Sequence, residues 1–198
     1  MILCKVENSK KINFVFMRKE PKSLTFDEFA DELLTEQQPR ALVILASAKI
    51  DMQLRQSLEK FLLPKFAKVK DDDELFDSMN PLSTFSSRIK LTHRLGLIDA
   101  SLAETLNKLR ELRNQAAHWT SFGVAEAPLR DQLRNLKSLI IERKSYGLTV
   151  SRFFTDSNLN ELETVKAVLL TLCVILESIQ IRIEEQSLSN VQKPIKVD

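Results

Sequence analysis

The chain has 198 residues, enough for one domain with a substantial apolar core. Only three glycines and six prolines occur in that length, which argues against a β protein rich in turns. The 29 basic and 27 acidic residues give a net charge of +2, too small to imply nucleic-acid binding without a local cluster. The longest uncharged apolar run, residues 167–176, is about half the length of a membrane span. We therefore expect a soluble protein and no membrane association.

The two cysteines, Cys4 and Cys173, are isolated and lack the spacing of metal ligands. Cys173 lies in an apolar run, where a thiol behaves as a small buried hydrophobe. Unpaired thiols of this kind fit a reducing cytoplasm. The sequence also contains no Gly-rich phosphate loop, no His-Glu-x-x-His pattern and no cysteine cluster. We therefore expect no cofactor and no metal. The absence of these motifs argues against a kinase, a nucleotide hydrolase or a zinc enzyme.

Residues 1–24 look like a basic appendage, because no acidic residue lies between Glu7 and Glu20. The short apolar alternation at 12–16 suits either a strand of a hairpin or an extended arm, and periodicity does not distinguish them. A helical domain is expected to follow at 25–187, and a polar tail at 188–198.

Two helices are expected in the first third of the chain. Thr25 followed by Glu28 forms a capping box and predicts a helix start. The second helix is long, at about 39–63, because Pro39 suits a first turn and Pro64 marks a stop. Its apolar residues recur at helical spacing, and Asp51 lies beside that stripe.

The next two predicted helices have clear ends. A third helix at 85–95 is closed by Gly96, a residue suited to the left-handed conformation of a helix end. Ser101 and Glu104 predict the capping box of a fourth helix at 101–117.

The last third of the chain predicts a fifth helix at about 128–144, a loop around Tyr146 and Gly147, and a long final helix at about 160–186. The whole pattern predicts an all-α domain, a bundle of five or six helices.

The end of the fourth predicted helix, residues 113–118, holds the side chains that metal-free RNA cleavage needs. A histidine transfers protons near neutral pH, and an arginine forks onto phosphate oxygens. Arg113 and His118 are five residues apart, about 140° around a helix, so they converge poorly, whereas Asn114 and His118 share a face. One histidine does not readily serve as base and acid together, so catalysis here predicts a homodimer. The alternative is structural, because the helix dipole favours His or Arg in a last turn.

Further basic and aromatic side chains are candidates for contacts with nucleic acid. One cluster lies on the third predicted helix beside His93, and another shares a face of the fifth with Lys137. A tryptophan directly after His118 has a ring that suits stacking on a base. The plainer interpretation is a solvated face for the charges and packing for the ring. The candidates are Arg88, Lys90, Arg94, Trp119, Arg130 and Arg134.

The segment 81–118 resembles the signature of the mannitol operon repressor family. It contains Pro-Leu, Ser, Arg-Ile-Lys and Leu-Gly-Leu-Ile, and then a helix that ends in Arg, four residues and His. This ending, with Asn directly after Arg, is also similar to that of the HEPN superfamily, helical bundles of which many are metal-independent ribonucleases of toxin–antitoxin and phage-defence systems. The HEPN resemblance implies that Arg113, Asn114 and His118 are catalytic. The repressor family adds Arg88, Lys90 and Gly96 as pattern residues without a catalytic role.

These observations lead to one main hypothesis and two alternatives. The main hypothesis is a homodimeric, metal-independent endoribonuclease in which His118 is the acid and base, Arg113 stabilises the phosphorane, and Asn114 orients the phosphate or His118. The first alternative is a non-catalytic transcriptional regulator or protein-interaction module. Leucines occupy the start of the fourth helix, where a DNA-reading helix would need polar residues, so such a regulator would act through a partner or an unusual surface. The second alternative is the neutralising or scaffolding half of a two-protein system, in which the basic arm Lys5–Lys22 docks to an acidic partner. For the ribonuclease hypothesis, the expected partners are an RNA substrate and an antitoxin or another regulatory protein.

Overall fold

Seven α-helices and no strand make up the part of the chain that the computed structural model describes, residues 25–63, 75–77, 79–118 and 127–189. The expected all-α helical bundle is confirmed, with one helix more than the six expected at most. The predicted arm at 1–24, Trp119 and Cys4 lie outside the described residues. The helices are α1 (Phe26–Thr35), α2 (Pro39–Phe61), α3 (Phe85–Arg94), α4 (Ala100–His118), α5 (Ala127–Ser138), α6 (Lys144–Phe153) and α7 (Glu161–Ser189).

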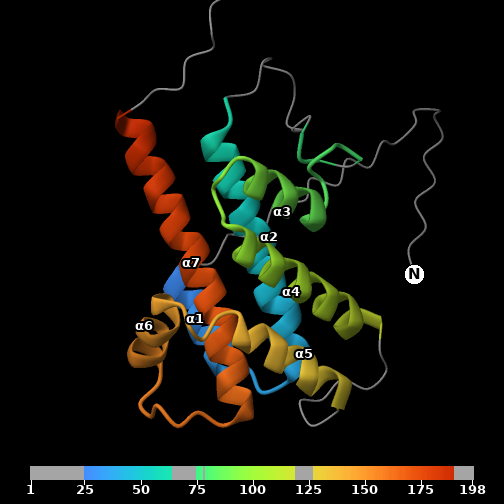
Figure 1. The fold of residues 1–198 in the computed structure, drawn as a ribbon, viewed down its shortest axis with the longest axis vertical. Helices are drawn as coiled ribbons and strands as arrows, with labels where there is room; N and C mark the ends of the chain where they lie inside the picture. The colour runs from blue at the N-terminus through green and yellow to red at the C-terminus, as the bar shows by residue number, and fades with distance from the viewer. Residues whose placement is uncertain (1–24, 64–74, 78, 119–126, 190–198) are drawn as a thin grey trace, which may run out of the picture.

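The two longest helices, α2 and α7, pack side by side and form the centre of the bundle (Figure 1). α1 and α6 pack against α7, and α1 also contacts α2. α3 and α4 pack against α2 and against each other, while α5 contacts both α4 and α7. α2 is therefore held by α7 on one side and by α3 and α4 on another (Figure 1).

α7 is the core helix, because every residue from 165 to 173 is buried. A helix that is apolar on all sides needs neighbours on all sides. Of the described helices, α7 is the one long and apolar enough to cross a membrane, and 61% of its most apolar stretch is buried inside the bundle, as in the core helix of a soluble domain. Cys173 is fully buried here, and burial raises the pKa of its thiol.

The local signals at three helix ends are confirmed. The backbone N–H of Thr25 donates to a Glu28 carboxylate oxygen at 2.8 Å, and the N–H of Glu28 donates back to the Thr25 hydroxyl at 3.3 Å. Pro39 stands in the first turn of α2. Gly96 follows α3 with a φ of 75°, a backbone conformation that costs little only for glycine.

The fourth helix begins one residue earlier than expected, and its cap is a different side chain. A carboxylate oxygen of Asp99 accepts the N–H of Leu102 at 2.6 Å, the bond of an N-cap residue. Ser101 lies inside the first turn, where its carbonyl accepts the hydroxyl of Thr105 at 2.8 Å. The predicted capping box of Ser101 and Glu104 is therefore wrong.

The predicted fifth helix at about 128–144 ends six residues earlier than expected, and the expected loop at Tyr146 and Gly147 is wrong because a further helix covers it. α5 ends at Ser138, and α6 contains both residues. The side chain of Tyr146 packs against the core, as does that of Phe153, and burial raises the pKa of the Tyr146 hydroxyl. This packing outweighs the cost of a glycine inside a helix, about 1 kcal/mol.

A pH dependence follows from the ion pair that joins the start of α4 to Arg143. The carboxylate of Asp99 accepts from Arg143 at 2.9 and 3.2 Å. The pKa of Asp99 is lowered by these bonds first and by the N–H of Leu102 second. Since its pKa is lower in the folded state, Asp99 stabilises the fold above its unfolded pKa of about 4, and this contribution is lost as pH falls through the lowered value.

We therefore expect Asp99→Asn to lower the urea midpoint of unfolding at neutral pH. The gap between wild type and variant should shrink as pH falls below about 4. Urea titrations at several pH values measure it, and a gap that stays constant down to acid pH would contradict the assignment.

Candidate functional site

An open groove of about 850 Å³ lies where α2, α3 and α4 meet. Residues 83–85 and Arg88, at the start of α3, form one wall, and Arg113 of α4 also lines the groove. The opposite wall is a stripe along α2 that follows the spacing of one helix face, with most members three or four residues from the next. That stripe is Ile44, Ala48, Asp51, Met52, Arg55 and Glu59.

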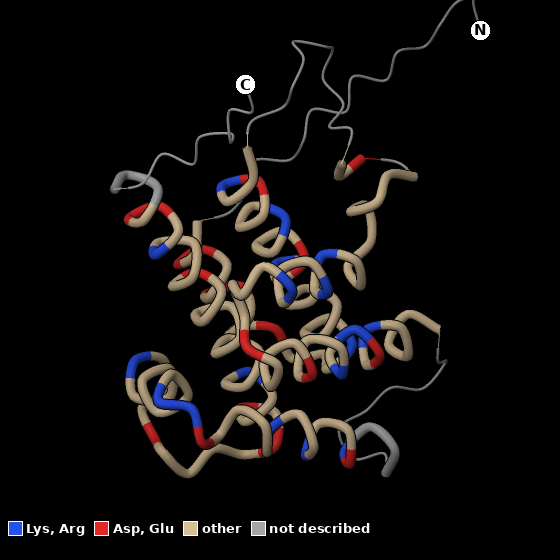
Figure 2. Tube along the Cα trace, turned by 45° about the horizontal axis from the view of Figure 1, so that its top comes forward, with Lys and Arg blue, Asp and Glu red and all other residues tan. Residues whose placement is uncertain are grey.

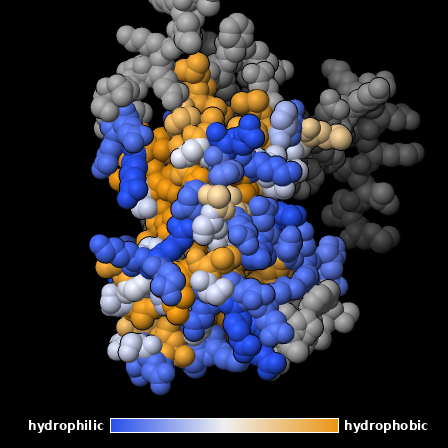
Figure 3. Space-filling model, viewed as in Figure 1, coloured by the Kyte–Doolittle hydropathy of each residue, from blue (hydrophilic) through white to orange (hydrophobic). Residues whose placement is uncertain are grey.

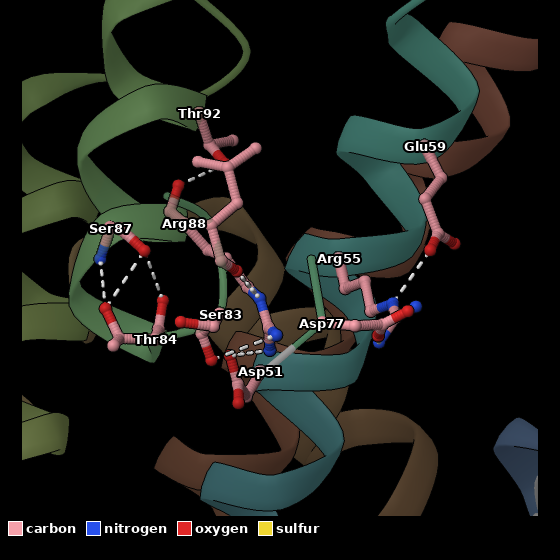
Figure 4. Close-up of polar contacts among 10 residues, drawn as sticks. Asp51, Arg55, Glu59, Asp77, Ser83, Thr84, Ser87, Arg88 and Thr92 are labelled. Atoms are coloured by element: carbon pink, nitrogen blue, oxygen red, sulfur yellow. Dashed lines mark hydrogen bonds and ion pairs between the residues drawn. The ribbon is translucent and has the colours of Figure 1, made fainter. Parts of the chain in front are cut away.

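The α3 wall of the groove is held in place by Arg88, which is only 7% exposed. Its Nη1 donates to a carboxylate oxygen of Asp51 at 2.8 Å, and its Nε donates to the Leu82 carbonyl at 2.8 Å (Figure 4). A further bond reaches the Ser83 carbonyl at 3.3 Å. The planar fork of a guanidinium suits this arrangement of acceptors. Arg88 thus ties the start of α3 to α2, and its donors are engaged inside the chain.

A second arginine of the groove is paired in the same way. The Nε of Arg55 donates to Glu59 at 2.7 Å, and its Nη1 donates to Asp77 at 3.1 Å (Figure 4). The guanidinium also lies over the ring of Phe76, 5.4 Å from its centroid. Arg55 and Arg88 are therefore each neutralised by a carboxylate and held in place by it.

Arg113 differs from these two arginines. Its side chain is exposed, and within the described residues its polar contact is the amide oxygen of Asn114 at 3.3 Å. Such a guanidinium is free to pair with a carboxylate or phosphate from another molecule. Ile44, on the opposite wall, is 41% exposed. The groove thus offers an available cation and an apolar anchor on a rigid frame.

Arg113 and His118 lie five residues apart near the end of α4. Arg113 lines the groove, whereas His118 is exposed at the last position of α4 and is not part of the lining. Within the described residues, the His118 ring has no hydrogen-bond or ion-pair partner. The other histidine, His93, lies on α3 with its Nδ1 3.2 Å from the Ile98 carbonyl.

The other predicted nucleic-acid contacts are spread over two helices. Lys90 and Arg94 are exposed on α3, and Arg130 and Arg134 are exposed on α5. Basic and acidic residues interleave along the described helices instead of forming one basic face (Figure 2). On the face shown in Figure 3, α4 and α5 present hydrophilic side chains, while apolar ones gather over α7. This distribution offers no continuous track for a phosphate backbone.

Sequence reasoning missed the α2 wall of the groove. Ile44 lies outside the apolar stripe that α2 buries in the core, and its side chain is exposed. An apolar residue outside the buried stripe of a helix is the one sign of this wall that the sequence contained. The pairing of Asp51 with Arg88 had no local signal, because the two residues are 37 positions apart.

Removing the carboxylate of Asp51 should destabilise the fold, because it leaves the buried guanidinium of Arg88 without its counter-charge. The Asp51 side chain is 31% exposed, so we expect Asp51→Ala to cost about 2 kcal/mol, below the range for fully buried pairs. The control is Glu104→Ala, which removes an exposed pair with Lys108 at 3.4 Å and should cost less than about 0.5 kcal/mol. Urea unfolding compares them, and equal small losses would contradict the structural role of the pair.

The chain matches no family model and no curated protein sequence. Two solved structures share its fold. A possible transcriptional regulator, YggD from Shigella flexneri 2a, is 16% identical with a TM-score of 0.56, covering 81% of this chain and 98% of that one. A chain in the MtlR–HPr complex from Escherichia coli is 18% identical with a TM-score of 0.54, covering 78% and 98%.

At 16% and 18% identity, the similarity to these two structures shows a shared fold and nothing finer. It extends over almost the whole length of both solved chains, so the helical bundle described above is the complete fold of each. The resemblance to the mannitol operon repressor family is supported at this level, whereas neither structure links the chain to HEPN proteins.

Proposed function

We propose that this protein is a non-catalytic regulatory protein that binds a partner protein in the groove between α2, α3 and α4. The observation that carries the proposal is the composition of that groove, in which Asp51, Arg55 and Arg88 form ion pairs within the chain while Arg113 and Ile44 are exposed and Arg113 has no ion pair within the described residues. Support comes from the fold, which is that of a possible transcriptional regulator and of a protein solved in complex with a protein partner.

The groove has the chemistry of recognition. Arginine and apolar side chains are the residues that anchor protein interfaces, especially when the surrounding groups are held rigidly. The ion pairs of Arg88 and Arg55 provide that rigidity, so the partner meets a preformed surface and orders little on binding. A partner that fits would place a carboxylate against Arg113 and an apolar side chain against Ile44.

HPr is the partner to test first, because the matched Escherichia coli structure is an MtlR–HPr complex. We expect HPr from that organism to bind the wild-type chain in isothermal titration. Reversing the available charge with Arg113→Glu should weaken binding by about tenfold or more, which is about 1.4 kcal/mol. The matched control is Arg130→Glu, an exposed arginine on α5, which should leave the affinity within about twofold.

Two results would contradict parts of this proposal separately. Equal affinity of HPr for wild type and Arg113→Glu would exclude the groove as the binding surface. Absence of binding by the folded wild-type chain would exclude HPr as the partner.

A second candidate function is the HEPN-type endoribonuclease, acting as a homodimer. It is favoured by the exposure of Arg113 and His118 at the end of α4, where an RNA strand has access to both. A second copy would have to supply the missing acid or base, since one histidine does not serve as both. The cation of Arg113 would then stabilise the phosphorane.

Incubation with single-stranded RNA in EDTA distinguishes the two candidates. The regulatory proposal predicts no cleavage by wild type or by His118→Ala, while HPr binding by the variant is retained. Cleavage in EDTA that is lost on His118→Ala would replace the regulatory proposal with the ribonuclease.

A further inference from the structure

A second cavity, of about 260 Å³, lies between α5 and the first turns of α7. It shares no helix with the groove, which is built from α2, α3 and α4. α5 and the start of α7 lie side by side at the same end of the bundle (Figure 1).

The deeper part of the α7 wall is apolar, beyond Glu161 and Thr164 of the first turn. Val165, Val168 and Leu169 line it and are each at most 5% exposed, and Leu136 of α5 joins them at 1%. These side chains belong to the main hydrophobic core. The cavity therefore opens onto the core of the bundle, where an apolar group of a ligand would lose its contact with water.

The α5 side of the cavity is cationic. Arg130, Arg134 and Lys137 all line it, and their spacing of four and three residues places them on one face of the helix. Within the described residues, Arg130 and Lys137 have no ion pair, and the pair of Arg134 with Asp131 is long, at 3.8 Å, and exposed, so it contributes little. Glu161 is the one carboxylate among the lining residues, which leaves an excess of positive charge.

The positive end of α7 does not itself provide the binding groups. Its first turn is already capped, because the Asn160 side chain accepts the N–H of Glu163 at 2.9 Å and the Glu163 carboxylate accepts the N–H of Asn160 at 2.9 Å. An anion in this cavity would be held by the side chains of α5.

We propose that this cavity binds a small amphipathic anion, with its carboxylate or phosphate on Arg130, Arg134 and Lys137 and its apolar part against Val165 and Val168. Because three cations lie beside an apolar wall, the cavity should bind a ligand that has both a negative charge and an apolar part more tightly than a purely polar anion or a neutral hydrocarbon. A cavity of about 260 Å³ is small, so the apolar part is a short chain or a single ring. The proposal goes beyond partner binding in the groove and does not depend on it.

Isothermal titration with octanoate tests the proposal, since this anion has the required length and charge. We expect octanoate to bind the full chain, and both 1-octanol and acetate to bind about tenfold more weakly or worse, because each retains only half of the interaction. The double variant Arg130→Ala/Arg134→Ala should weaken octanoate binding by a similar factor.

The matched control is Lys90→Ala/Arg94→Ala, which also removes two exposed positive charges, but from α3. Its octanoate affinity should stay within about twofold of wild type. Both double variants change exposed residues, and circular dichroism establishes that each is folded.

Several outcomes would overturn the proposal. These are no octanoate binding by wild type, equal binding of octanoate and 1-octanol, or equal weakening by the two double variants. Displacement of octanoate by a short single-stranded RNA would instead identify the α5 cations as a nucleic-acid contact. Loss of HPr binding has no bearing on this test, because the cavity and the groove are built from different helices.

Discussion

The packing of α7 against α2 is the constraint on which the rest of this structure depends. Residues 165–173 of α7 are buried without interruption, so the helix is stable only when neighbours surround it. Two amides fix how α2 lies along it. The Nε2 of Gln53 donates to the Cys173 carbonyl at 3.1 Å, and that of Gln180 donates to the Gln53 carbonyl at 2.8 Å. Because one face of α2 is committed to α7, another face is left for α3, α4 and the groove.

The two proposed sites follow from this arrangement. Each is formed where outer helices meet one member of the central pair, and each combines a rigid apolar or paired wall with exposed cations. In the groove the rigidity comes from ion pairs around Asp51 and Arg88. In the cavity it comes from the core residues of α7. Both compositions favour binding.

Sequence predicted those features that depend on neighbours in the chain. The box of Thr25, the position of Pro39 and the left-handed Gly96 all act within a few residues. α6 was missed because its stability comes from tertiary packing of Tyr146, which outweighs the adjacent glycine. The groove was missed because its defining pair joins helices distant in sequence, which no local pattern encodes.

Amide hydrogen exchange, with and without HPr, tests the central claim that the groove is the surface through which this protein acts. The account predicts that HPr slows exchange in peptides covering residues 44–59 and 83–88, while peptides of α5 and the start of α7 keep their rates. Protection confined to α5, or to the end of α4 around His118 without α2, would contradict it.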